Sequence, residues 1–84
     1  MIHSQQFEFI TIKYIGDSPT GKTRIYDVIS NEDGFVLGII KWNPHWRKYW
    51  FLPSNDTGYE EKCMGDIANF LIMLKEDRMF ELRG

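Results

Sequence analysis

The sequence predicts a small α+β domain over residues 1–84, in which a four-stranded antiparallel β-meander is followed by one C-terminal α-helix packed on one face of the sheet. Three observations predict this fold. Residues 1–53 contain four runs rich in β-branched and aromatic residues. Clusters of Gly, Pro, Asn and Asp separate these runs. Beyond residue 53 the apolar residues recur at spacings of three and four, as on one face of a helix.

The four strands are expected over residues 7–15, 22–30, 35–42 and 46–52. The Gly-Asp-Ser-Pro-Thr-Gly cluster at 16–21 is typical of a turn. Asp33-Gly34 supplies the positive-φ position of a hairpin turn. Asn43-Pro44 marks the third connection, because proline cannot donate a hydrogen bond to a strand ladder. The short connections make the predicted sheet an antiparallel meander.

The helix is expected at about residues 60–77. Its apolar face consists of Cys63, Ile67, Phe70, Leu71 and Leu74. Asp56 and Thr57 are N-cap candidates, and Thr57 has capping-box spacing to Glu60. Residues 78–84 are expected to form a frayed tail.

Composition limits the classes of function. The chain is 43% hydrophobic, 15% aromatic and 26% charged, which is typical of a folded chain. No apolar run approaches the ~20 residues that span a bilayer, and the N-terminus lacks the basic and apolar regions of a signal peptide. We therefore expect neither a membrane partner nor export. The single cysteine excludes an intramolecular disulfide framework and a Cys-based zinc site, and it fits a reducing, cytoplasmic compartment. The net charge of −2 argues against a generic nucleic-acid coat.

Both faces of the predicted central strands are apolar. One alternating set is Tyr26, Val28, Val36, Ile40, Trp42, Tyr49 and Phe51. The other is Ile25, Ile29, Phe35, Leu37, Ile39, Trp46, Trp50 and Leu52. One helix covers only one face, and the second face of an antiparallel sheet is usually polar. The remaining face therefore needs strong curl, the N-terminal strand, a dimer partner or a ligand to cover it. Asp27, Lys41 and Lys48 belong to the second set, which favours that set as the uncovered face.

The candidate binding site is the stretch 41–51, which holds five aromatic residues, three fixed positive charges and no acid. The residues assigned to the site are Lys41, Trp42, His45, Trp46, Arg47, Lys48 and Tyr49. Aromatic and arginine residues are typical of a protein interface, so we expect a small binding module that uses this face against a protein partner or a second copy. The alternative is nucleic-acid or nucleotide binding, by stacking on Trp42, Trp46 and Tyr49. A hairpin whose aromatics pack the sheet and whose charges face water would give the same composition.

No catalytic residue, cofactor or metal site is expected. Gly16 to Thr23 match the spacing of a phosphate-binding loop, but a β-type sequence follows instead of a helix, so a hairpin turn is expected there. His3 and His45 are the only imidazoles, and no spacing indicates a Ser-His-Asp or Cys-His pair. Cys63 is expected to be a small core residue. We therefore predict that the chain is not an enzyme.

Four segments together form a recognisable pattern. They are Lys22-Thr23-x-x-Tyr26-x-Val28, Leu37-Gly38-x-Ile40-x-Trp42, Trp46-Arg47-x-Tyr49-x-Phe51-x-Pro53 and Cys63-x-x-Asp66-Ile67-x-x-Phe70. This pattern, over residues 22–75, resembles a group of small uncharacterised proteins in bacterial and bacteriophage genomes. The resemblance implies a phage or prophage-like setting and no assigned activity. The alternate residues that it shares imply one sheet face, the helix-covered core, with Trp42 and Arg47 at its rim.

Overall fold

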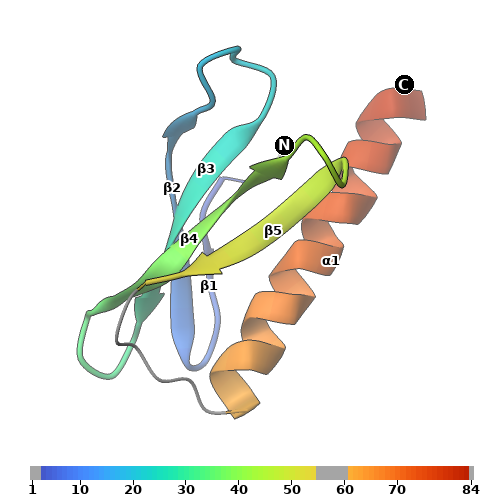
Figure 1. Ribbon diagram of the computed structural model, residues 1–84. Helices are drawn as coiled ribbons and strands as arrows, with labels where there is room; N and C mark the ends of the chain where they lie inside the picture. The colour runs from blue at the N-terminus through green and yellow to red at the C-terminus, as the bar shows by residue number, and fades with distance from the viewer. Residues whose placement is uncertain (1–2, 55–60, 84) are drawn as a thin grey trace.

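The computed structural model describes residues 3–54 and 61–83, and it contains one antiparallel sheet followed by one helix (Figure 1). The sheet has five strands in chain order, each paired with the next. The elements are β1 (Gln5–Gln6), β2 (Ile10–Asp17), β3 (Arg24–Ser30), β4 (Val36–Asn43), β5 (Lys48–Pro53) and α1 (Glu61–Arg83). The α+β class and the C-terminal helix are confirmed, but the predicted count of four strands is wrong. The N-cap candidates Asp56 and Thr57 lie outside the described residues.

The additional strand is β1, a pair of glutamines that no apolar pattern marks. Gln5 pairs with Ile12, and Gln6 with Thr11. The chain then turns at once, since the Phe7 N–H donates to the Ile10 carbonyl at 2.8 Å. Residues 7–9 were predicted to start a strand because of their aromatic side chains, but they form this turn instead. The strand proper therefore begins at residue 10.

The segment with phosphate-loop spacing is a β-hairpin, as predicted. The Ser18 N–H donates to the Thr23 carbonyl at 2.8 Å, which closes the loop between β2 and β3. Within the loop the Gly21 N–H donates to the Ser18 carbonyl, also at 2.8 Å. Gly21 has a φ of 73°, a conformation that glycine adopts without strain. The chain continues from this loop into β3, so no helix N-terminus is present to hold a phosphate.

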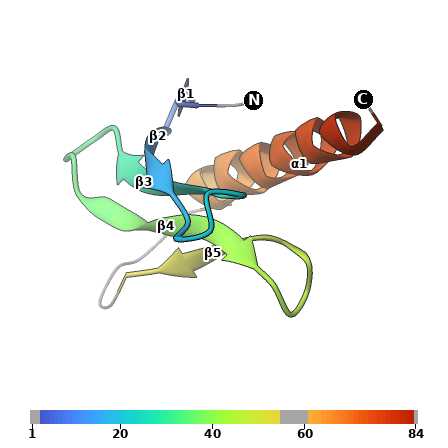
Figure 2. The ribbon, with the colours of Figure 1, turned by 90° about the horizontal axis from the view of Figure 1, so that it is seen from above.

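Helix α1 covers one side of the sheet and leaves the other side uncovered (Figure 2). The buried core between them consists of Ile10, Ile12, Tyr26, Val28, Leu37, Ile40 and Tyr49 from the strands and Ile67, Phe70 and Leu74 from the helix. The first alternating set therefore faces the helix, and the second, with Asp27 and Lys41, is the uncovered one, as these two charges favoured. Lys48, which was assigned to the uncovered face as well, instead lines the space between the β4–β5 hairpin and α1. Aromatic edge-to-face contacts join the layers: the Tyr26 and Phe70 ring centroids are 5.1 Å apart.

A β-bulge reverses this assignment at one place. Val28 pairs with Gly38, but the next residue, Ile29, pairs with Val36, so the register with β3 skips Leu37. The extra residue shifts the alternation of β4 by one position. As a result Leu37 is buried in the core at 8% exposure and Val36 is 43% exposed, the reverse of the faces predicted from strict alternation.

The sheet divides into two arms beyond the bulge. The pairing between β3 and β4 ends at Tyr26 and Ile40, and the β2–β3 and β4–β5 hairpins then diverge (Figure 1). Helix α1 runs past this division and continues to Arg83, so the segment predicted as a frayed tail is helical up to that residue. Contacts of Asp77 and Arg78 with the strands, described below, explain the extension. Within the described residues, α1 lacks the apolar length needed to cross a membrane.

Candidate binding site

The turn between β4 and β5 is closed by the side chain of Asn43. Its Oδ1 accepts hydrogen bonds from the backbone N–H groups of His45 at 2.9 Å and Trp46 at 3.1 Å, as in an Asx turn. The Asn43 carbonyl oxygen accepts the N–H of Arg47 at 2.7 Å. The side chain of His45 is exposed. The hydrogen bonds of Asn43 therefore define this turn, which ends at Arg47.

Arg47 ends this turn in the left-handed region, with a φ of 58°. A residue with a Cβ is strained there by about 1–2 kcal/mol, and glycine would adopt the same conformation without strain. The Arg47 side chain lines the space between the hairpin and α1. A left-handed residue is common at the end of a short hairpin turn, so the turn itself accounts for this conformation.

The structure places the predicted site residues on two sides of the sheet. Trp42 and Tyr49 pair across β4 and β5 on the helix side, with their ring centroids 5.3 Å apart in a T-shaped arrangement. On the other side Trp46 packs against Trp50, with centroids 5.2 Å apart. Lys41 is the cross-strand partner of Trp50 and lies on that side too. The single aromatic and basic face expected from the sequence is therefore divided.

A groove of about 490 Å³ lies between the β4–β5 hairpin and the second half of α1. The sheet contributes Trp42, Arg47, Lys48 and Tyr49 to its lining, and the helix contributes Leu71, Ile72, Lys75, Arg78 and Met79. Four of the predicted site residues thus line the groove, whereas Lys41, His45 and Trp46 do not. Apolar walls with a few polar groups at the rim are typical of a binding site.

The charges that line the groove are all positive. They are carried by Arg47, Lys48, Lys75 and Arg78. No carboxylate of the described residues joins them: Asp77, which precedes Arg78, lies 3.3 Å from Arg24 instead. The chain as a whole has a net charge of −2, so the groove is a local reversal of sign. A concentration of one charge in a concave site attracts a ligand of the opposite charge.

The two aromatic rings of the groove are already in contact with neighbours. The Arg78 guanidinium Cζ lies 4.2 Å from the centroid of the Trp42 ring, a cation–π contact. Tyr49 is 7% exposed, and its Oη accepts the backbone N–H of Arg24 at 3.2 Å. One face of Trp42 and nearly all of Tyr49 are therefore inaccessible to a stacking base.

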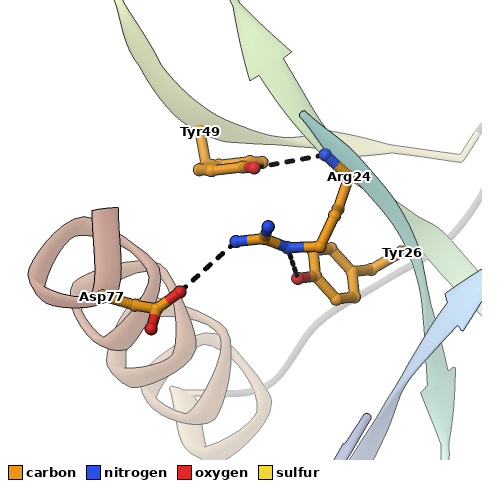
Figure 3. A network of polar contacts seen from close by, with 4 residues as sticks. All are labelled: Arg24, Tyr26, Tyr49 and Asp77. Carbon is orange, nitrogen blue, oxygen red and sulfur yellow. Dashed lines mark hydrogen bonds and ion pairs between the residues drawn. The ribbon is translucent and has the colours of Figure 1, made fainter. Parts of the chain in front are cut away.

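A polar network holds the helix against the divided end of the sheet (Figure 3). Arg24 Nε donates to Tyr26 Oη at 3.0 Å, and Arg24 Nη2 to Asp77 Oδ2 at 3.3 Å. Because β3 and β4 are not paired at Arg24, the Tyr49 hydroxyl accepts the Arg24 N–H that a strand would otherwise take. Burial raises the pKa of the Tyr26 hydroxyl, and Arg24 lowers it in part. The network links β3, β5 and α1, so the groove is preformed.

The helical wall of the groove was missed by the sequence reasoning. Ile72 and Met79 are 54% and 48% exposed and do not belong to the core stripe of α1. They lie on a second stripe formed by Met64, Ala68, Ile72, Lys75 and Met79. Spacings of three and four define this stripe as they define the core stripe, and that was the available signal.

A second pocket, of about 390 Å³, lies near the start of α1 and is lined by Glu8, Phe9, Ser30, Asn31, Glu32 and Cys63. Asn31 Nδ2 donates to the carbonyls of Phe7 at 2.9 Å and Glu8 at 3.1 Å. These hydrogen bonds connect the turn at residues 7–9 to the end of β3. Cys63 is half-buried and packs against the core, as predicted. Within residues 3–54 and 61–83, no three His, Cys, Asp or Glu side chains gather as metal ligands.

Comparison with known proteins gives a setting for the chain and no activity. The chain is 27% identical over 75 residues to an "Uncharacterized 9.3 kDa protein" of Acholeplasma phage L2, and the match covers 89% of this chain and 91% of that protein. No protein-family model matches the chain. No solved structure matches it. The chain is thus similar to a small phage protein, in agreement with the setting that its sequence pattern implies.

Proposed function

We propose that the protein is a binding module that holds an acidic, amphipathic segment of a partner protein in the groove between the β4–β5 hairpin and α1. The observation that carries this proposal is the lining itself: among the described side chains, four cations and no carboxylate surround an apolar floor. Acidic side chains of the segment would pair with the cations at the rim. Its apolar side chains would contact Ile72 and Met79, which are exposed in the free chain.

The state of the aromatic rings favours a protein segment over a nucleic acid. Of the three rings that could stack on bases, Tyr49 is buried and Trp42 is covered on one face by Arg78. Only Trp46, at 57% exposure, remains open, and it does not line the groove. Base stacking contributes much of the affinity for single strands. Nucleic-acid binding is therefore the alternative that the test must separate.

The test is calorimetric titration of the full chain with a short synthetic peptide rich in Glu and Asp, with Leu or Phe at every third or fourth position. The control peptide has Lys at every acidic position. We expect the acidic peptide to bind, its affinity to fall as salt rises, and the control peptide not to bind. An oligothymidylate serves as the nucleic-acid probe.

Matched lysine variants locate the binding. Lys75→Glu reverses a charge in the groove and should weaken binding of the acidic peptide at least about tenfold. Lys62→Glu makes the same change on the same helix, outside the groove, and should leave the affinity within about twofold. If neither peptide binds, or if both variants have the same effect, the proposal is wrong. Tight binding of the oligothymidylate that Lys75→Glu abolishes would establish the alternative.

A further inference from the structure

The side of the sheet away from α1 is more apolar than a water-facing antiparallel sheet usually is. We call it the open face and define it by the apolar residues Ile15, Ile25, Ile29, Val36, Ile39, Trp50 and Leu52. None of the seven is buried, and Ile15 and Val36 are 49% and 43% exposed. All five strands belong to the one sheet and α1 lies on its other side, so no described element covers this face (Figure 2).

The apolar residues of the open face are contiguous across the strands. Ile29 pairs with Val36, and Ile39 pairs with Leu52. Cross-strand partners have Cβ atoms about 5 Å apart, so these pairs leave little space for water between them. Trp50 continues the patch on β5, and Trp46 packs against its ring. Aliphatic residues dominate the patch, which suits a protein surface better than a nucleic acid.

The open face carries one acid, Asp27, and two bases, Lys13 and Lys41, and Asp27 and Lys41 are placed so that they can pair between two copies. Asp27 pairs with Lys13 on one neighbouring strand and with Ile39 on the other. Lys41 lies two residues beyond Ile39, diagonal to Asp27 on the adjacent strand. A two-fold axis that runs between two stacked sheets, and passes between these residues, places Asp27 of each copy opposite Lys41 of the other. Asp27 and Lys41 thus form two equivalent ion pairs in a symmetric dimer, and Lys13 lies beside Asp27 of its own chain.

The size of the open face sets the area that such a dimer buries. Four strands of six to eight residues, β2 to β5, contribute to it. Spacings of about 4.8 Å between strands and 3.3 Å along them give a patch roughly 20 Å on each side, or about 400 Å². This is about half of the ~800 Å² that each partner buries in a standard interface, so the dimer is expected to be a weak one.

We propose that two copies of the chain pack open face to open face, giving a two-sheet sandwich with a helix on each outer side. Sheets that pack in this way lie about 10 Å apart, with interdigitated side chains. The groove on the helix side stays accessible in this dimer. The inference is therefore independent of the proposed ligand of the groove.

The first test is the mass of the full chain in solution, by sedimentation equilibrium. We expect twice the 10.0 kDa of the chain. Ile39→Lys, at the centre of the open face, should weaken the dimer at least about tenfold, whereas the control Ile72→Lys, in the groove, should leave the mass unchanged. A monomer at ~100 μM, or a dimer that Ile39→Lys does not weaken, would overturn the proposal.

A charge-exchange experiment tests whether Asp27 of one copy faces Lys41 of the other. It uses two different variants, so its outcome does not rest on the folding of a single one. Asp27→Lys and Lys41→Asp each place like charges opposite one another in the symmetric dimer, so each alone should dimerise at least about tenfold more weakly. When the two variants are mixed, every facing pair is again of opposite charge, and the heterodimer should form. If both variants dimerise as the unaltered chain does, or if mixing restores nothing, the proposed packing is wrong.

Discussion

The two sides of the β4–β5 hairpin carry similar residues in different states. On the helix side Trp42 and Tyr49 are packed among partners of the same chain: Arg78 covers the Trp42 ring, and the Tyr49 hydroxyl accepts the backbone N–H of Arg24. On the open side Trp50 is half-buried, and its Nε1 is enclosed with no hydrogen-bond partner among the described residues. On the helix side the strands pack against α1, and four cations line the groove between them. The open side is apolar, and no described element covers it.

The difference shows why a dense stretch of sequence is not itself a site. Successive strand residues point to opposite faces, so residues 41–51 divide between two surfaces with different surroundings. One surface gains cations from α1 and lines the groove for which we propose an anionic segment. The other carries Asp27 and Lys41 on neighbouring strands and is the one for which we propose a second copy. Each surface therefore needs its own test.

The close packing of the helix side is most easily broken at Gly38. A Cβ there would lie 2.3 Å from the Leu52 carbonyl oxygen and 2.7 Å from the Phe51 ring. Gly38→Ala should therefore lower the free energy of unfolding by about 3 kcal/mol. Gly65→Ala is the matched control, because its Cβ meets nothing within 4 Å on α1, and it should raise stability by ~0.5–1 kcal/mol. Urea denaturation measures both, and equal effects would refute the packing difference.

The network of Figure 3 makes the helix side sensitive to charge removal as well. Arg24→Ala removes the ion pair with Asp77, whose side chain is 18% exposed. We expect a loss of about 2–3 kcal/mol, less than for a fully buried pair. Lys13→Ala on the open face should change stability by less than about 0.5 kcal/mol. Denaturation of both variants at one protein concentration gives the comparison, and a similar loss for Lys13→Ala would contradict it.

The same network predicts a pH dependence. Burial raises the pKa of Tyr26 above its ordinary value of 10.0. The folded state therefore holds this proton more tightly than the unfolded state does. The protonated Tyr26 hydroxyl contributes to the free energy of unfolding below pH 10, and this contribution is lost as the pH rises through the folded pKa. Urea midpoints measured from pH 8 upward should fall above pH 10, and they should fall less in Tyr26→Phe. An equal fall in the variant would show that Tyr26 is not the group responsible.

The smallest effect on stability is expected at Arg47. Arg47→Gly removes the strain of the left-handed conformation but gives a more flexible unfolded chain, so the net change should be within about 0.5 kcal/mol. Arg47→Ala removes the same charge and keeps the strain, so it should be about 1 kcal/mol less stable than the glycine variant. Both should bind the acidic peptide about tenfold more weakly. Unchanged affinity in both would remove Arg47 from the proposed site.

The order of the elements could be predicted from the sequence because each strand is a local pattern bounded by its own turn. The hairpins at residues 16–21 and at Asn43-Pro44 depend on neighbouring residues alone, and they form where expected. Local sequence patterns did not predict the features that depend on pairing between strands. The two-residue strand β1 exists only through its pairing with β2, and the bulge at Leu37 exchanges two side chains between faces without any local signal.

The groove could be predicted only in part. Its strand residues were found because they are concentrated in one stretch, but its helical wall depends on where α1 crosses the sheet. That crossing is fixed by contacts between distant residues, such as Arg24 with Asp77, which are 53 positions apart. Arg78 over Trp42 is a contact of the same kind. No spacing along the chain marks either pair. Strand alternation alone divides the site residues between two faces, but the position of the helical wall required the structure.

The three tryptophans allow one measurement to test both surfaces. Two-dimensional ¹H–¹⁵N NMR resolves the indole N–H of Trp42, which lines the groove, from those of Trp46 and Trp50, which lie away from it. We predict that the acidic peptide shifts the Trp42 signal and leaves Trp50 unchanged, whereas dilution of the protein shifts Trp50 and leaves Trp42 unchanged. A peptide-induced shift at Trp46 and Trp50 without one at Trp42 would contradict the account that the two sides of the hairpin serve different partners.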